Sequence, residues 1–183
     1  MKRLGAIFAG GQARRFGGDK AMALIDGRSM LDHVIARLAP QVDDLVIVGR
    51  DWPGLARVDD LPRPGLGPLG ALAGALAYAH TTHFSEVLTS GCDLPEIPDD
   101  LVEKLKPGPA VIKGQPLLGL WPAALGDRLL DYLDRTEDRS MRGWIAQSKA
   151  GTIAFPQPLA NINTPEELAA WIAIRLADRR SSP

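Results

Sequence analysis

The 183-residue sequence contains a single cysteine, Cys92, and no long apolar run. One cysteine cannot form an internal disulfide, which excludes a small secreted scaffold held by disulfides and favours a reducing compartment. No segment approaches the roughly 20 consecutive apolar residues of a membrane-spanning helix. The apolar stretch Leu4–Ala9 is too short for the core of a signal peptide. We therefore expect a cytoplasmic protein with no membrane partner.

The chain also lacks a surplus of charge of either sign. It has 21 basic and 22 acidic residues, for a formal net charge of −1. Proteins that bind duplex nucleic acid usually carry a basic surplus, so this balance argues against a nucleic-acid partner and leaves room for a local basic patch. The length fits a single domain over residues 1–178, followed by a short frayed tail at 179–183.

Short apolar segments alternate with amphipathic or alanine-rich segments along the chain. The apolar segments are typical of strands buried on both faces of a parallel sheet. Ser29 and Thr164 are placed to cap helices, because each is followed three residues later by an acidic residue. Strands are expected at 4–9, 45–48, 87–89, 110–112, 116–121 and 152–155, and helices at 29–39, 69–79, 99–105, 123–135, 141–148 and 165–177. The alternation predicts an α/β fold with a mostly parallel central sheet.

The most informative segment is the glycine-rich loop after the first predicted strand. In an open α/β sheet, ligands bind beyond the carboxyl ends of the strands. Gly10 and Gly11 allow the backbone to approach a phosphate or a base closely, and successive amides in such a loop can bind an anion. Arg14, Arg15 and Lys20 add three positive charges, close to what a triphosphate requires for neutralisation.

The same loop does not match two well-known phosphate-binding sequences. It is not a Walker loop, because Gly18 is followed by Asp19 rather than by lysine, and it lacks the spacing of G-x-G-x-x-G. A flexible surface turn with solvated arginines is the alternative interpretation. The combination of two glycine pairs, two arginines and a lysine after a buried strand favours phosphate binding.

Two carboxylates are candidates for the same ligand. Asp93 follows the strand predicted at 87–89, in a tight turn of small residues, where it could hold Mg²⁺ or simply tighten the turn. Asp60 precedes Pro62 in a loop; it could contact the nucleotide or a metal-bound water, or be solvated. A shared site requires the glycine loop and Asp93 to face each other across one triphosphate.

A pair of asparagines, Asn161 and Asn163, lies just before the last predicted helix. Asparagine side chains at such a place can bond to nearby backbone and make a turn, or they can present amides to a ligand. The residues alone favour the turn.

Together these residues resemble the molybdenum cofactor guanylyltransferase family, over nearly the whole chain from Leu4 to Leu168. The motifs are, in chain order, Ala9-Gly10-Gly11-x-x-x-Arg15-Phe16-Gly-x-Asp19-Lys20, Gly67-Pro68-Leu69-Gly70-Ala71-Leu72, Cys92-Asp93-Leu94-Pro95, Arg139-Ser140-Met141-Arg142-Gly143-Trp144 and Asn161-Ile162-Asn163-Thr164-Pro165-Glu166-Glu167-Leu168. The first and third are shared with other sugar- and cofactor-nucleotidyltransferases. The Asn-x-Asn-Thr-Pro end is more particular to the molybdenum branch. Gly49 stands where relatives carry an asparagine.

The resemblance implies a three-layer Rossmann-like nucleotidyltransferase fold and a magnesium-dependent reaction. In that reaction GMP passes from GTP to the terminal phosphate of molybdopterin, and pyrophosphate is released. Lys20 and Arg15 would face the phosphates, Asp60 would contact the nucleotide, and Asp93 would bind Mg²⁺. The other implied contacts are the backbone of Phe8, Ala9 and Gly10, with Gly11 beside it, for the nucleotide, and Asn161 and Asn163 for molybdopterin. Molybdoenzymes or their chaperones are candidate receivers of the product.

Two alternatives stay open from the sequence. One is a different nucleotidyltransferase, which adds CMP to molybdopterin or a nucleotide to a sugar phosphate. The other is a nucleotide-binding module without catalysis, which would bind GTP and release no pyrophosphate. Asp93 and Lys20 argue against the module, because a pure binder has less need of a metal at the α-phosphate.

Overall fold

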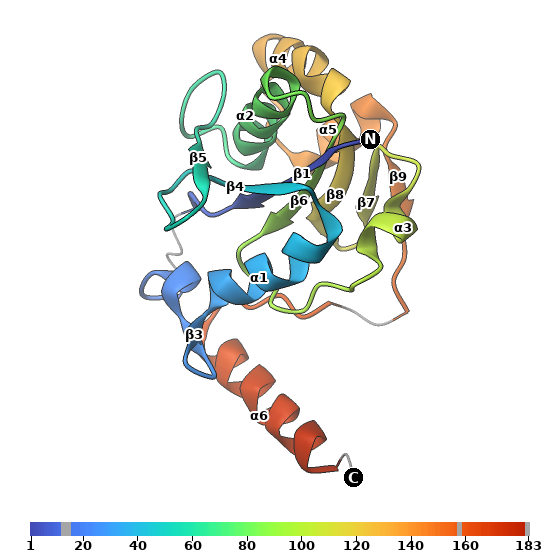
Figure 1. Ribbon diagram of the computed structural model, residues 1–183. Coiled ribbons are helices and arrows are strands. Elements are labelled where there is room, and N and C mark those ends of the chain that lie inside the picture. Colours follow the sequence, from blue (N-terminus) through green and yellow to red (C-terminus); the bar gives the residue numbers. More distant parts are fainter. Residues whose placement is uncertain (12–15, 157–158, 182–183) are drawn as a thin grey trace.

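The computed structural model describes residues 1–11, 16–156 and 159–181, and its centre is a seven-stranded sheet (Figure 1). The strands stand in the order β5-β4-β1-β6-β8-β7-β9. Their bounds are β1 Arg3–Phe8, β4 Asp44–Val48, β5 Ala56–Val58, β6 Glu86–Gly91, β7 Ala110–Ile112, β8 Gln115–Pro122 and β9 Gly151–Ile153. β8 runs antiparallel to both neighbours, and the other pairs are parallel. The predicted α/β class with a mostly parallel sheet is confirmed.

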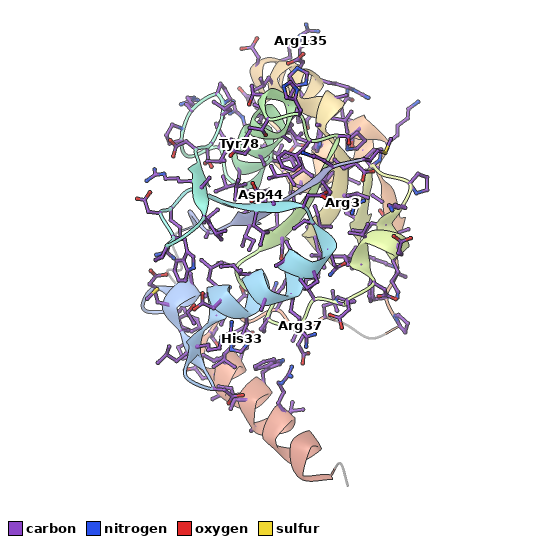
Figure 2. The ribbon with its side chains drawn as sticks, in the orientation of Figure 1. Arg3, His33, Arg37, Asp44, Tyr78 and Arg135 are labelled. Atoms are coloured by element: carbon purple, nitrogen blue, oxygen red, sulfur yellow. The ribbon has the colours of Figure 1, made fainter. Side chains whose placement is uncertain are left out.

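Helices cover both faces of the sheet, which gives the three layers. One face carries α2 (Pro68–Thr81), α4 (Gly126–Arg135) and α5 (Met141–Ser148), and the other carries α1 (Met30–Leu38) and α3 (Leu101–Leu105). Figure 2 shows Tyr78 of α2 and Arg135 of α4 on one side of the sheet, and His33 and Arg37 of α1 on the other.

The strand side chains divide between these two faces with the expected period of two. In β4, Val46 and Val48 are buried against α2, whereas Leu45 and Ile47 are buried with the residues of α1 and α3. Apolar residues therefore point both ways, which explains why the strand reads as a continuous apolar run in the sequence.

The helix α2 packs unusually close to the chain that precedes it. A Cβ atom added at Gly74 would lie 2.1 Å from the carbonyl oxygen of Asp59, so an alanine there would displace the loop or the helix. The same Cβ atom would lie 3.4 Å from Val58 Cγ1 of β5, so the helix also packs closely on the edge strand of the sheet.

The two predicted helix caps are both formed. The Ser29 hydroxyl accepts a hydrogen bond from the Asp32 amide at 3.1 Å, which starts α1. At the other end of the chain, the Thr164 hydroxyl accepts from the Glu167 amide at 3.2 Å, and the Glu167 carboxylate accepts from the Thr164 amide at 3.2 Å. This reciprocal pair is a capping box, and it fixes the start of α6 (Pro165–Ser181).

The helix α6 extends away from the rest of the molecule (Figure 1). It continues to Ser181, beyond the predicted end near Ala177 and into the segment that we expected to be a frayed tail. Within the described ranges, no helix is both long enough and apolar enough to cross a membrane.

Three short strands were not predicted. β2 (Leu24–Ile25) and β3 (Arg28–Ser29) form a hairpin around Asp26-Gly27, where only the turn was expected. Both turn residues have positive φ, 50° at Asp26 and 78° at Gly27, as a two-residue hairpin turn requires. The third, β5, pairs with β4 at the sheet edge. It contains the exposed Arg57, so it does not appear in the sequence as a run of apolar residues.

Candidate active site

A cavity of about 740 Å³ opens at the carboxyl edge of the sheet. It lies where β1, β4 and β6 end, three neighbouring parallel strands whose last residues are in register, Phe8 opposite both Val48 and Gly91. Its lining consists of Phe8, Ala9, Gly10, Gly11, Asp19, Lys20, Ala21, Val48, Arg50, Asp60, Gly65, Gly67, Pro68, Ala71, Gly91, Cys92, Asp93, Leu117 and Asn163. This is the place where open α/β sheets bind ligands.

Backbone hydrogen bonds hold the three loops of the cavity together. The Ala9 amide donates to the Val48 carbonyl at 3.0 Å, and the Cys92 amide donates to the Phe8 carbonyl at 3.3 Å. The loops after β1 and β6, which we predicted to face one ligand, are therefore joined by a backbone hydrogen bond where the two strands end.

Two glycines bring the loops after β1 and β4 into direct backbone contact. A Cβ atom at Gly49 would lie only 2.6 Å from the Cα atom of Gly10, and Gly49 has a φ of +87°. A Cβ atom at Gly10 would in turn lie 3.0 Å from the Cα atom of Gly49. With this backbone, an asparagine at position 49 would force the two loops apart.

Lys20 is the centre of a small polar network on the cavity wall. Its Nζ donates to Asp93 Oδ2 at 3.0 Å and to Asn163 Oδ1 at 2.9 Å. The Lys20 and Asp93 side chains are 11% and 20% exposed, so the ion pair is largely shielded and still reaches the cavity. The glycine loop and Asp93 thus face each other, which the sequence hypothesis required.

Asp93 is also held through its backbone. The backbone carbonyl oxygen of Asp93 accepts a hydrogen bond from the Ile162 amide at 3.0 Å, which anchors the segment before α6 to the turn after β6. On the opposite side, a Cβ atom at Gly91 would lie 2.5 Å from Asp93 Oδ1. Glycine at position 91 therefore leaves this oxygen its space.

Asp60 lies on the side of the cavity formed by the start of α2. Burial raises the pKa of its carboxyl group, an effect partly opposed by a hydrogen bond from the Gly65 backbone and reinforced by the charge of Asp59. The neighbouring residues Gly67 and Pro68 also line the cavity. Asp60 therefore combines a semi-buried acidic group with the positive end of a 14-residue helix.

The structure gathers most of the residues proposed from the sequence. Eight of them line the cavity: Phe8, Ala9, Gly10, Gly11, Lys20, Asp60, Asp93 and Asn163. Asn161 is exposed and is absent from the cavity lining, so only the second asparagine of the pair reaches the site. Arg15 and its neighbour Arg14 lie outside the described residues. The roles assigned to all these residues stay predictions.

Sequence reasoning missed the pair Asp19 and Arg50, which also lines the cavity. Arg50 NH1 donates to Asp19 Oδ1 at 2.9 Å, and its NH2 pairs with the other oxygen of the same carboxylate. Arg50 follows the second central strand, so it belongs to the same sheet edge as the glycine loop. That position was the signal that could have revealed it.

Cys92 lines the cavity as an unreactive thiol. Burial raises the pKa of the Cys92 thiol from an ordinary 9.0 to about 11, and the adjacent Asp93 carboxylate adds to the rise. The thiolate fraction near neutral pH should therefore fall by about a hundredfold relative to the unfolded chain.

We expect iodoacetamide at pH 8 to label the native protein about a hundredfold more slowly than the protein unfolded in urea. Mass spectrometry over a time course measures both rates, and Cys92 is the only cysteine in the sequence, so the label reports a single site. Equal labelling rates in the native and the unfolded protein would contradict the raised pKa of the Cys92 thiol.

Known proteins resemble this chain over most of its length. The model of the MobA-like NTP transferase domain matches residues 5–152. The molybdenum cofactor guanylyltransferase of Rhizobium meliloti (strain 1021) is 35% identical, covering 91% of this chain and 90% of its own. That of Cereibacter sphaeroides is 36% identical, covering 92% and 95%.

Two solved structures share the fold. Molybdopterin-guanine dinucleotide biosynthesis protein A from Archaeoglobus fulgidus has a TM-score of 0.72 at 21% identity, covering 95% of this chain and 99% of that one. A CMP:2-keto-3-deoxy-manno-octonic acid synthetase complexed with CTP has a TM-score of 0.68 at 15% identity, covering 97% and 100%. The three-layer nucleotidyltransferase fold is thereby confirmed. With this fold and these relatives, the chain belongs to the molybdenum cofactor guanylyltransferases, nucleotidyltransferases of the MobA-like NTP transferase family.

Proposed function

We propose that the cavity transfers GMP from GTP to the terminal phosphate of molybdopterin, forming molybdopterin guanine dinucleotide and pyrophosphate. The observation that carries the proposal is the meeting of the Lys20 ammonium and the Asp93 carboxylate at 3.0 Å, beside the Gly10-Gly11 backbone, in a cavity of about 740 Å³. The names of the curated relatives supply the identity of the substrates.

Mg²⁺ is part of this proposal, and the residues present fit the ion. Within 1–11, 16–156 and 159–181, no three His, Cys, Asp or Glu side chains come together as a metal-binding group. Mg²⁺ is commonly held by one or two carboxylates, with phosphate oxygens and water as the other ligands, which is the donor set that Asp93 and a triphosphate would provide. Gly91 leaves room at Asp93 Oδ1. When bound, the ion would neutralise charge on the phosphates.

The residues of the chain bind and orient the triphosphate. The backbone of Gly10 and Gly11 lets phosphate or base approach without a side chain in the way. The Lys20 ammonium, held by Asp93 and Asn163, supplies a positioned positive charge for the reacting phosphates and for the leaving pyrophosphate. The N-terminus of α2, at Gly67 and Pro68, adds a partial positive charge at the cavity wall.

The reaction itself needs little covalent help from the protein. An oxygen of the acceptor's terminal phosphate attacks the α-phosphorus of GTP, and the bond from that phosphorus to the β-bridging oxygen breaks. The bond electrons leave with pyrophosphate. A phosphate nucleophile is already anionic near neutral pH, so no general base is required, and positioning and charge neutralisation dominate.

The proposal extends to the surroundings of the enzyme. A cytoplasmic location fits the single cysteine, Cys92, which cannot form an internal disulfide. Molybdoenzymes or their chaperones would receive the guanine dinucleotide product.

The test is a nucleotide panel with molybdopterin and Mg²⁺, assayed by pyrophosphate release. We expect GTP to support release at least about tenfold faster than CTP, ATP or UTP, and omission of molybdopterin or of Mg²⁺ to abolish it. A preference for CTP would make the chain a cytidylyltransferase. GTP binding without pyrophosphate release from any nucleotide would overturn the proposal.

A further inference from the structure

Asp19 and Arg50 form an ion pair on the cavity wall that the proposed reaction does not use, with the Asp19 side chain 45% and the Arg50 side chain 26% exposed. Arg50 donates from both terminal nitrogens to the two oxygens of the Asp19 carboxylate. Two parallel hydrogen bonds of this kind fix the relative orientation of the two groups as well as their distance. The pair connects the loop after β1 with the loop after β4, across neighbouring strands.

Each member of the pair is held by further contacts. The Asp19 carboxylate also accepts from the Ala21 amide at 3.2 Å, and so caps the short 3₁₀ helix η1 (Lys20–Met22). The Arg50 guanidinium lies 5.8 Å from the centre of the Trp52 ring, within the range of a cation–π contact. Arg50 is therefore placed by its own loop, and Asp19 is placed by Arg50.

Phe16 packs against the cluster of Ile25, Met30 and Ile162, but the two glycines between it and Asp19 add no packing of their own. Gly17 has a φ of +70°, and a Cβ atom at Gly17 or Gly18 would have no described atom within 4 Å. Two glycines in open space leave the backbone free to adopt many conformations. Ala21, in the middle of η1, is buried in the core, and the ion pair with Arg50 adds the contact that holds Asp19 at the start of this helix.

Lys20 depends directly on this arrangement. It follows Asp19 in the chain and is the first residue of η1, and its ammonium has to reach Asp93 and Asn163 across the cavity. A displacement of Asp19 would move the Lys20 backbone, and with it the Cα atom from which the lysine side chain extends.

The positive charge of Arg50 is already paired with the Asp19 carboxylate, so we do not expect Arg50 to bind phosphate itself. The Asp19 carboxylate holds both terminal nitrogens of the guanidinium, so direct binding of a triphosphate by Arg50 would have to break this pair. The hydrogen bond from Arg50 also holds the pKa of the Asp19 carboxyl group below its ordinary value, as expected for a carboxylate that is already paired with this guanidinium.

We propose that Arg50 is a positioning residue, which acts through Asp19 to hold the start of η1 and thereby the Lys20 ammonium at the triphosphate. The expected effect of Arg50 on the reaction rate rests on the proposed function. The expected effect on phosphate binding requires only that a phosphate binds at Lys20.

The test measures Arg50→Ala in three backgrounds: the wild type, Asp19→Ala and Lys20→Ala. In the wild type, the substitution should lower kcat/KM for GTP about tenfold. In the other two backgrounds it should change kcat/KM by less than about twofold, because the contact through which it acts is already gone. The same fold-loss in all three backgrounds, or no loss in the wild type, would overturn the proposal.

Conservative variants separate positioning from a general structural role. Arg50→Lys keeps the charge but cannot form the two parallel hydrogen bonds, so it should restore the activity only in part. Asp19→Asn keeps a good helix cap but loses the ion pair, and it should fall between the wild type and Asp19→Ala. Thermal unfolding of each variant shows whether it is folded. Full activity in Arg50→Lys would contradict the role of the paired geometry.

Arg57→Ala is the matched control. Arg57 forms similar ion pairs with Asp51 and Asp59, and it does not line the cavity. Its replacement should leave kcat/KM within about twofold of the wild type in all three backgrounds. An effect as large as that of Arg50→Ala would overturn the proposal, because any ion pair in the region would then suffice.

A binding measurement distinguishes failure of this inference from failure of the proposed function. Calorimetric titration with inorganic tripolyphosphate measures the effect of Arg50→Ala on phosphate affinity in the same three backgrounds. This probe contains no nucleobase, and the titration needs no acceptor. If the wild type does not transfer GMP but the comparison holds for tripolyphosphate affinity, only the proposed function fails. Equal losses of tripolyphosphate affinity in all backgrounds, or no measurable binding to the wild type, would overturn the positioning role.

Discussion

Replacing Asp93 with alanine is expected to lower the rate of pyrophosphate release by about a thousandfold, equivalent to roughly 4 kcal/mol of transition-state stabilisation. The carboxylate is the protein ligand that we propose for Mg²⁺, and its ion pair with Lys20 also orients the ammonium. Both effects are lost together in the variant. The affinity for GTP measured without Mg²⁺ should change much less than the rate, because the ion acts mainly on the reacting phosphates.

The fold should survive this substitution. The backbone carbonyl of Asp93 keeps its hydrogen bond from Ile162, and Lys20 keeps Asn163 as a partner. We expect the free energy of unfolding to fall by about 2 kcal/mol, measured by urea denaturation, because the shielded Lys20 ammonium loses one of its two partners.

The controls are a second acidic residue and the removal of the metal. Asp99→Ala changes an acid that is 83% exposed and paired with Arg37, and it should leave the rate unchanged. Wild-type enzyme treated with EDTA should fall to a residual rate similar to that of Asp93→Ala. Turnover near the wild-type rate in Asp93→Ala, with the fold intact, would refute the metal role.

Replacing Lys20 with alanine is expected to lower kcat/KM for GTP by roughly a hundredfold and to weaken GTP binding. Removal of the ammonium takes one positive charge from a largely shielded part of the cavity, where its interaction with phosphate is weakly screened. It also leaves the Asp93 carboxylate without its ion-pair partner. The negative charge that remains then faces the triphosphate directly.

Lys20→Met provides a nearly isosteric form of the same experiment, since it keeps much of the side-chain length. Lys104→Ala is the matched control, because Lys104 pairs with Asp100 along an exposed helix turn outside the cavity. Titration calorimetry with GTP and steady-state rates measure the two effects. Unchanged affinity and rate in Lys20→Ala would count against a role for the lysine.

The strands and helix starts could be predicted because their signals are local. Continuous apolar runs marked β1 and β4, the shorter stretch Val87-Leu88-Thr89 marked β6, and the side chains of Ser29 and Thr164 marked the first turns of α1 and α6. The carboxyl ends of parallel strands share one edge, which was enough to place the glycine loop and Asp93 together.

What the sequence could not reveal depends on pairing between distant segments. The antiparallel insertion of β8 between β6 and β7 follows from strand order, for which no residue of β8 carries a local signal. The same holds for Asp19 and Arg50, which are 31 positions apart. Each reads as a solvated charge until β1 and β4 are known to be neighbours.

The two asparagines show the limit at the level of single side chains. In the cap of α6, it is the Asn163 backbone N–H, and not its side chain, that donates to the Glu167 carboxylate. The Asn163 side chain accepts from Lys20, while Asn161 is exposed. Ile162 between them is buried in the core, and this burial has no counterpart in the local sequence signal for a turn.

The bond between Lys20 and Asn163 joins positions 143 residues apart. During translation, the residues of β1, β4 and β6 have all emerged from the ribosome once about half of the polypeptide has been made. The lysine receives its amide partner only after residue 163 has been made. A chain that stops before residue 163 therefore lacks one of the two partners of this ammonium, and nucleotide turnover would begin only when synthesis is nearly complete.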